Sequence, residues 1–477
     1  MNRRDFLRGA MIGAAATMLP GSASVVLGKR RPHLKGGSIL DLPPAHAPID
    51  HVVVVMMENR SFDHYLGWLG SDEAYLEAGR KAYGRRFAVD ANPAQQYPMP
   101  DGTPVDTYHL TTGPETNPFR GCPFGDPGHG WDAGRAQRDR GFLADGSDND
   151  AFALGYYTAD DLPFYAALAR RFTIFDRYHC SVLGPTYPNR EYLHSAQSGG
   201  LKSNLFPPEA GYPAGFDWPT IWDKLTAAMV PARYYFSDLP VTAFWGARLN
   251  GISVPVARYF EDAAAGTLPN VTFVDPRFLG DGETDEHPLG DVRAGQRFVS
   301  EVVKAFVESP HWQRGLMFLT YDEWGGFFDH VPPPTMRDDR ASDLDEDNFG
   351  QAGFRVPTRM LSPYARPGFV DHELYDHTSI LRFIEWRFLG APPHGPGRKQ
   401  RNWWLTSRDR YANNIGFSLR PRRPDPEVDL PEATVDTSPG CSAEGSGLVA
   451  VERPVSDLER GFREGFFERM GYGAVGR

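Results

Sequence analysis

The feature that most constrains the fold is an unbroken apolar run at residues 51–57, which contains four consecutive valines. A run with no polar alternation predicts a strand that is buried on both faces, as in the middle of a parallel sheet. The run ends at Glu58, where polar residues begin. Further short strands are predicted at 172–175, 233–236, 271–274, 316–320 and 358–361.

Segments with helical periodicity lie between these runs. Residues 292–308 place their apolar side chains on one face of a helix. Residues 377–388 form a second such segment, with Thr378 or Ser379 as a plausible N-cap. Strands that alternate with helices predict an α/β fold: a mostly parallel, doubly wound central sheet with helices on both faces.

The remaining segments predict loops around this sheet. Residues 71–150 are rich in Gly, Pro and Asp and have weak periodicity, so we expect a long insertion over the end of the sheet. Residues 335–352 are acidic and predict a surface loop. We place the main domain at 49–416 and an extended tail at 417–477. That tail contains six prolines within 417–457 and a short helix near 457–470.

The first thirty residues are typical of a signal peptide. The pair Arg3 and Arg4 precedes a short apolar run at 10–19, Pro20 and then small residues. A helix that crosses a bilayer needs about 20 apolar residues, so this run is too short to be an anchor. We interpret residues 1–30 as a twin-arginine signal and 31–48 as a linker. The alternative is a chance arginine pair in a basic terminus.

This interpretation implies that the twin-arginine translocase exports the chain. The expected locations are the periplasm, the cell surface or the extracellular space. The cysteines Cys122, Cys180 and Cys441 allow one disulfide at most.

The net charge and the absence of several motifs exclude some classes of protein. Lys and Arg number 50 against 61 Asp and Glu, a net charge of −11, which argues against binding of nucleic acid. There is no GxxxxGK[ST] phosphate loop, no HExxH and no GxSxG. A GxGxxG at 471–476 has no room for a following helix and second strand, so we reject it.

Polar residues follow the predicted strands where ligands bind in open α/β sheets. Glu58 and Asn59 follow the first run, Asp275 follows the run at 271–274, and Asp322 and Glu323 follow the run at 316–320. Carboxylate and amide oxygens are ligands for hard divalent cations. Together these residues predict a metal site of unknown metal identity. The alternative is that each acid caps a strand or a helix.

A candidate nucleophile lies in the turn Leu-Gly-Pro-Thr-Tyr-Pro-Asn-Arg at 183–190. Thr186 follows a strand and precedes a helix-like stretch, so it lies near a helix N-terminus that attracts anions. Contact with a metal would lower the pKa of its hydroxyl. The alternative is that Thr186 only caps the helix.

Three histidines are candidates for contact with a phosphoryl group: His129, His287 and His330. An imidazole can donate a hydrogen bond to a phosphoryl oxygen or protonate a leaving alkoxide. For His330 we expect the double glycine at 325–326 to turn the chain back toward the metal. A structural role is expected for His64, His179 and His377.

Several motifs together resemble the bacterial phosphoesterase family, which includes secreted phospholipases C and acid phosphatases. They are ENRSFDHYLG at 58–67, YHCSVLGPTYPNR at 178–190, EHP at 286–288, YDEWGGFFDHVPPP at 321–334 and DHTSILRFIEWRF at 376–388. The GPT and YDE choices are similar to the phospholipase branch, above all its mycobacterial type. The phosphatase branch typically has Ser and Asp at positions 186 and 323.

The resemblance implies an alkaline-phosphatase-like fold and a phosphoesterase domain at 49–416. It implies metal ligation by Glu58, Asn59, Asp322, Glu323 and Thr186, with Thr186 as the nucleophile. His129, His287 and His330 would surround the phosphoryl group. Trp324 departs from the family, in which Asn is common at this position.

The implied activity is that of an exported, metal-dependent phospholipase C. It would cleave the glycerol-side phosphodiester of phospholipids such as phosphatidylcholine through a phospho-threonine intermediate. The alternative within enzymes is an acid phosphatase with broad phosphomonoester specificity. The alternative from another class is a catalytically inactive binding protein at the cell surface.

A phospholipase must meet a lipid surface, and we expect this contact to be transient. Trp324, Phe327 and Phe328 lie between the proposed metal ligands and His330, and Trp324 is the preferred residue for the pocket mouth. The alternative is that these rings pack in the core.

Overall fold

The computed structural model describes residues 34–472, apart from 93, 99–102, 114–115, 289, 398–401, 434–459 and 461–462. The predicted signal peptide and its arginine pair therefore lie outside the described residues, as does Cys441. Within these residues, no helix is both long enough and apolar enough to cross a membrane. Cys122 is in a disulfide, and Cys180 is a buried free thiol.

A mixed sheet runs through the middle of the described unit. Its strands are β1 (His51–Met57), β6 (Thr173–Phe175), β7 (Ala232–Phe236), β8 (Ser253–Pro255), β9 (Val271–Val274), β10 (Gly315–Tyr321), β11 (Arg359–Leu361) and β12 (Val370–Asp371). Their order across the sheet is β12-β6-β11-β10-β1-β9-β7-β8. All neighbouring pairs are parallel except the two that β11 makes with β10 and β6.

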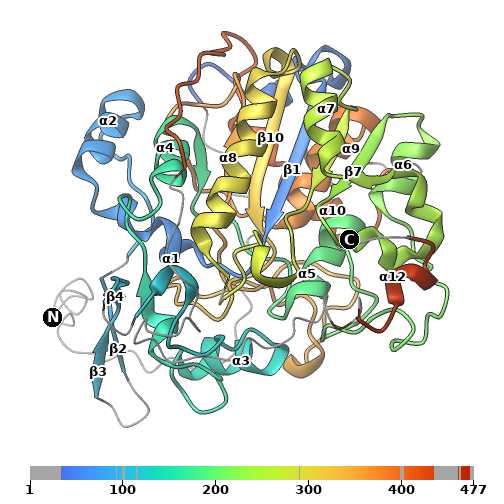
Figure 1. Cartoon of the computed structure of the whole chain (residues 1–477). Coiled ribbons are helices and arrows are strands. Elements are labelled where there is room, and N and C mark those ends of the chain that lie inside the picture. Colours follow the sequence, from blue (N-terminus) through green and yellow to red (C-terminus); the bar gives the residue numbers. More distant parts are fainter. Residues whose placement is uncertain are drawn as a thin grey trace, which may run out of the picture. The chain divides into compact units, whose positions relative to one another are not determined.

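Helices of very different length connect and flank these strands. They are α1 (Phe62–Leu66), α2 (Glu73–Tyr83), α3 (Trp131–Arg140), α4 (Pro163–Arg171), α5 (Thr186–Ser195), α6 (Ile221–Ala227), α7 (Ala257–Ala265), α8 (Val292–Glu308), α9 (His377–Leu389), α10 (Ser407–Tyr411) and α12 (Phe466–Arg469). In Figure 1, α7 and α8 lie in front of β1 and β10, and α9 lies behind them. Two small sheets, β2 (Gln96–Pro98) with β3 (Pro104–Asp106) and β4 (Tyr108–His109) with β5 (Gly155–Tyr156), lie outside the main sheet.

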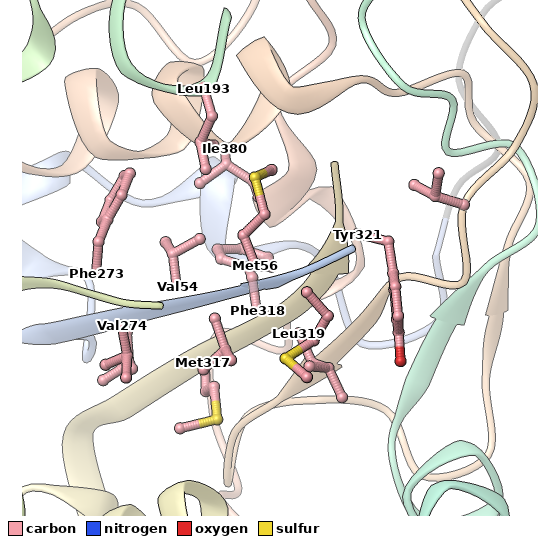
Figure 2. Close-up of a cluster of buried hydrophobic side chains, with 14 of the residues drawn as sticks. Val54, Met56, Leu193, Phe273, Val274, Met317, Phe318, Leu319, Tyr321 and Ile380 are labelled. Atoms are coloured by element: carbon pink, nitrogen blue, oxygen red, sulfur yellow. The ribbon is translucent and has the colours of Figure 1, made fainter. Parts of the chain in front are cut away.

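Both faces of the central strands are buried, which explains the continuous apolar run in β1. Val54 pairs with Phe273 of β9 and Phe318 of β10, so these three side chains share one face. Leu193 of α5 and Ile380 of α9 cover this face, whereas Val274 and Met317 point to the other (Figure 2). All seven of these side chains are buried.

The α/β fold class with a mostly parallel sheet is confirmed. β1, β9 and α8 have the predicted bounds, and the predicted helix at 377–388 is α9. Its N-cap is Asp376, whose carboxylate accepts a hydrogen bond from the N–H of Thr378, so the expected cap at Thr378 or Ser379 is wrong.

Two expectations about the loops need correction. The insertion at 71–150 contains two helices, α2 and α3, which its weak periodicity did not predict. Trp324, Phe327 and Phe328 are 0%, 0% and 5% exposed, so none of them forms a lipid-facing mouth. Trp324 instead donates its indole N–H to the Gln137 side chain at 2.7 Å.

The segments at the two ends of the described unit pack on the main domain. Within the predicted linker, Ile39 and Ala47 are buried, and the N–H of Ile39 bonds the carbonyl of Leu419 at 2.9 Å. In the predicted tail, Phe466 of α12 contacts the ring of Phe206, with 4.6 Å between the ring centroids.

Candidate active site

Four of the predicted metal ligands, Glu58, Asn59, Asp322 and Glu323, lie where β1 and β10 end side by side, and we call this group the cage. Met57 pairs with Tyr321 in the parallel ladder, so the residues that follow them, Glu58 and Asp322, leave the sheet together. The N–H of Asn59 donates to Asp322 Oδ1 at 3.1 Å. Glu58, Asn59, Asp322 and Glu323 are all buried. The structure therefore places the four predicted metal ligands at the same edge of the sheet.

The turn after β1 needs unusual backbone geometry. Asn59 has a φ of 61°, in the left-handed region that Asn tolerates better than most residues. Gly325 packs against this turn, and a Cβ at this position would lie 2.1 Å from the Asn59 carbonyl oxygen. Only glycine fits there, which explains the first glycine after Trp324.

A buried guanidinium that the sequence analysis did not assign lies against the cage. Arg190 of α5 is 1% exposed and lies 3.3 Å from Glu58 Oε1, 3.2 Å from Asp322 Oδ2 and 3.2 Å from Asp275 Oδ2. It is part of the Pro-Asn-Arg segment that follows Thr186. Asp275 also accepts a hydrogen bond from the Tyr234 hydroxyl, so these two partners hold its carboxylate.

The cage contains three carboxylates, those of Glu58, Asp322 and Glu323, and the guanidinium of Arg190 lies within ion-pair distance of the first two. Burial is the main cause that raises the pKa of Glu58, Asp322 and Glu323, whereas Arg190 opposes the shift for the first two. Asn59 Oδ1 and Glu323 Oε1 are buried and accept no hydrogen bond from any described residue, and Glu58 Oε1 is held only by its ion pair with Arg190. Buried oxygens without partners are costly unless a cation binds them. Carboxylate and amide oxygens suit a divalent metal by their chemistry. The ligand atoms of Glu58, Asp322 and Glu323 do not all lie within 4.8 Å of one another, as those of Asp126, His129 and His287 do.

Thr186 lies at the start of α5, on the side of the helix that faces the cage. It is the first helical residue, and the N-cap is Pro185, so Thr186 does not act as the helix cap. Its hydroxyl makes no hydrogen bond to any described residue. Residues i and i+4 share a helix face, so Thr186 lies on the same face as Arg190, which contacts Glu58 and Asp322. The role of Thr186 as the nucleophile stays a prediction.

His129 and His287 lie beside the cage and close to each other. His129 Nε2 is 3.2 Å from Asn59 Nδ2 and 3.9 Å from Glu323 Oε1. The two imidazole centroids are 5.7 Å apart, and His287 Nε2 is 3.7 Å from Asp126 Oδ2. Burial lowers the pKa of His129, but the carboxylates of Glu323 and Asp126 raise it to about 9.

The contacts of Asp126 also were not predicted. Asp126, His129 and His287 each offer one ligand atom, and these atoms lie within 4.8 Å of one another. The Nδ1 of His129 bonds the Pro127 carbonyl at 2.7 Å, so its Nε2 faces the site.

The structure does not bring His330 to this group. Its Nδ1 bonds Asp63 at 2.5 Å and its Nε2 bonds Asp90 at 2.9 Å. Arg355, which is fully buried, joins the same cluster through Asp63 and Asp329. Both ring nitrogens of His330 are therefore engaged by carboxylates. These contacts argue against the predicted role of His330 at the phosphoryl group and indicate that it links loops.

The other histidines have the structural surroundings expected for them. His377 donates from Nε2 to the backbone carbonyl of Asp322 at 2.7 Å, and burial lowers its pKa to about 4. His64 and His179 are buried and bond the carbonyls of Gly155 and Gly353. His377 thus supports the backbone from which a cage carboxylate extends.

A polar cavity of about 630 Å³ adjoins the site. His129 and Pro185 both line it, so it reaches the start of α5 and one side of the cage. Most of its other lining residues are polar: Asp132, Asp148, Lys202, Ser203, Asn204 and Glu346. Lys202 pairs with Asp347 at 2.5 Å.

Comparison with protein families gives one match across most of the chain. A model described as the Phosphoesterase family matches residues 49–389. Fold, site and relatives define a hydrolase that acts on phosphoric ester bonds. The chain belongs to the Phosphoesterase family, which confirms the resemblance stated from its motifs.

Its relatives include proteins from plants and bacteria. Non-specific phospholipase C1 of Arabidopsis thaliana is 32% identical over 84% of this chain and 77% of that protein. Phospholipase C B of Mycobacterium tuberculosis is 32% identical over 81% of this chain and 82% of that protein. Non-hemolytic phospholipase C of Pseudomonas aeruginosa is 31% identical over 86% of this chain, which spans 64% of that protein.

Solved structures match at low identity. A phosphonate monoester hydrolase from Silicibacter pomeroyi has a TM-score of 0.31 and 14% identity, over 54% of this chain and 74% of that chain. A protein in the alkaline phosphatase superfamily from Vibrio parahaemolyticus has a TM-score of 0.29 and 11% identity, over 48% and 60%.

Proposed function

We propose that the protein is an exported, metal-dependent phospholipase C that cleaves the glycerol-side phosphodiester of phospholipids such as phosphatidylcholine. The observation that carries the proposal is the hydroxyl of Thr186. It makes no hydrogen bond to any described residue, and it lies on the same helix face as Arg190, whose guanidinium contacts Glu58 and Asp322. The names of the relatives, three phospholipases C, support the same activity.

The metal would be held by Glu58, Asn59, Asp322 and Glu323, with Thr186 completing the set. Asn59 and Glu323 each have a buried oxygen that accepts no hydrogen bond from a described residue, which supports this assignment. When bound, a divalent cation would lower the pKa of the Thr186 hydroxyl and neutralise charge on the phosphate oxygens. Arg190 holds Glu58 and Asp322 in place from the side of α5.

The reaction would proceed in two displacements at phosphorus. Thr186 Oγ1 loses its proton to solvent as it bonds to phosphorus, the bond to the glycerol oxygen breaks, and the leaving alkoxide takes a proton from an imidazole to become diacylglycerol. Water then attacks the phospho-threonine, which releases the phosphorylated head group and restores the hydroxyl. His129 and His287 would hold the phosphoryl oxygens and supply the proton to the alkoxide.

The cavity beside Thr186 suits the head group better than the acyl chains, because polar side chains form most of its wall. Contact with a lipid surface stays part of the proposal, although the three aromatic residues are buried. Leu344 is 59% exposed and belongs to the same loop as Glu346, which lines the cavity. It is therefore a better candidate for transient lipid contact than Trp324.

A panel of substrates tests the function. After metal removal and add-back, we expect the chain to release diacylglycerol and a phosphorylated head group from dispersed phosphatidylcholine. A soluble chromogenic phosphodiester should also be hydrolysed, and the chelated protein should be inactive on both. Hydrolysis of phosphomonoesters with no turnover of any phospholipid would favour the acid phosphatase alternative.

Export is tested on the full precursor. We expect replacement of Arg3 and Arg4 by lysine to retain the precursor in the cytoplasm, because the twin-arginine machinery recognises the guanidinium pair. The measurement is the fraction of chain outside the cytoplasm, with the native precursor in parallel. If the double-lysine form is exported as well as the native precursor, the general secretory route is favoured.

A further inference from the structure

Glu286 forms a buried junction next to the active site that the proposed chemistry does not use. Its side chain is 1% exposed and accepts hydrogen bonds from three tyrosine hydroxyls. Tyr65 of α1 donates to Oε2 at 2.9 Å, Tyr321 of β10 donates to Oε2 at 2.8 Å, and Tyr165 of α4 donates to Oε1 at 2.5 Å. One carboxylate thus joins three separate elements.

The backbone of Glu286 is held as firmly as its side chain. The guanidinium of Arg60 donates twice to its carbonyl oxygen, at 2.9 and 2.5 Å. Its φ is 75°, a left-handed conformation that Glu rarely adopts, so the surroundings must impose it. Gly295 of α8 leaves room for the side chain, since a Cβ there would lie 2.1 Å from Glu286 Cγ.

Each of these contacts leads to a neighbouring residue of the candidate site. Tyr321 directly precedes Asp322, Arg60 directly follows Asn59, and His287 directly follows Glu286. The N–H of Arg60 also donates to the Glu323 carbonyl at 3.1 Å. Glu286 therefore bonds both Tyr321, which precedes Asp322, and Arg60, which follows Asn59, and it sets the backbone from which His287 extends.

We propose that Glu286 is a positioning residue that fixes His287 relative to the metal cage. The hydrogen bonds of the Glu286 carboxylate hold the left-handed turn at Glu286 against β10 and α1. This turn places the imidazole of His287 beside that of His129. The positioning role of Glu286 depends on the proposed function only in experiments that measure enzymatic turnover.

A double-mutant cycle between Glu286 and His287 tests this role, because coupled residues are not additive. We expect Glu286→Gln to lower kcat/KM for a soluble chromogenic phosphodiester at least tenfold in the native background. In the His287→Ala background it should lower kcat/KM less than twofold. The dissociation constant of inorganic phosphate, measured by calorimetry on the same four proteins, should follow the same pattern. Equal factors in both backgrounds, by either measurement, would overturn the proposal.

Removal of single hydroxyls provides variants that should fold even if Glu286→Gln does not. Tyr165→Phe removes one donor to Glu286 and should weaken phosphate binding severalfold. Tyr75→Phe is the matched control, because the Tyr75 hydroxyl is buried and makes no hydrogen bond within the described part of the chain. It should leave phosphate binding unchanged. If both variants bind phosphate as the native chain does, the hydroxyl contacts to Glu286 do not position the site.

The proposed phosphoesterase function and the positioning role of Glu286 can be contradicted by different results. A native chain that turns over no phosphoester would contradict the phosphoesterase chemistry. The phosphate-binding cycle would still decide whether Glu286 acts through His287.

Discussion

Replacement of Thr186 by alanine is expected to reduce turnover on the order of 10³-fold or more, because the nucleophile of a covalent mechanism cannot be supplied by another residue. The fold should be unaffected. Thr186 is not the N-cap of α5, and its hydroxyl makes no hydrogen bond to a described residue, so the change removes no internal bond. The measurements are kcat/KM on a soluble phosphodiester and the thermal midpoint of unfolding.

Two further variants separate the hydroxyl from the shape of the side chain. Thr186→Val keeps the branched volume and should be as inactive as Thr186→Ala, whereas Thr186→Ser keeps a hydroxyl and should retain part of the activity. Rapid quenching of the native enzyme followed by mass spectrometry should find a phosphoryl group on Thr186. Near-native rates in Thr186→Ala would mean that water attacks phosphorus directly.

Much of the sheet could be predicted because burial on both faces leaves a clear sequence signal. After His51, the run at β1 contains only apolar residues, and α8 repeats its apolar positions with helical spacing. The direction of β11 could not be predicted, since a strand of three residues has no pattern that distinguishes a parallel from an antiparallel neighbour. α3 was missed because its sequence, WDAGRAQRDR, contains a glycine and five charged residues.

The metal cage could be predicted because parallel strands end at a common edge, which places Glu58 beside Asp322. Arg190 could not be assigned from sequence alone, since its contacts with Glu58 and Asp322 span 132 residues along the chain. Glu286 was visible only as part of the EHP motif, and nothing local indicates that three distant tyrosines bond its carboxylate.

Two residues show how local sequence can mislead. Trp324 lies between Glu323 and Gly325, neighbours that suggest exposure, yet its indole reaches Gln137 in the loop insertion. His330 follows a double glycine whose first residue does pack on Asn59. The intervening residues nevertheless carry the imidazole to Asp63 and Asp90. In both cases the partner lies more than 180 residues away, beyond any local pattern.

Removal of one charge from the cage should weaken metal binding on the order of 100-fold, a loss as large as those known for conserved residues around metals. Asp322→Asn and Glu58→Gln each keep the shape of the side chain and remove a formal negative charge. Metal content after gel filtration and elemental analysis should fall below one ion per chain in both variants. Addition of excess metal should raise the thermal midpoint of the native protein but not that of the variants. A ligand that binds only the folded state at about 100 times its Kd stabilises it by about 2.7 kcal/mol.

Asp275→Asn is the matched control for this experiment. Asp275 also is buried, also follows a central strand and also bonds Arg190, at the same 3.2 Å as Asp322. It has a second partner in Tyr234 and is not among the metal ligands that the family resemblance implies, so the metal content of this variant should stay near native. If Asp275→Asn loses metal as readily as Asp322→Asn, the loss acts through a displaced Arg190 rather than through a missing ligand.

If Asp322→Asn and Glu58→Gln both keep one ion per chain, the metal is held elsewhere. The group of Asp126, His129 and His287 would then be the next site to test.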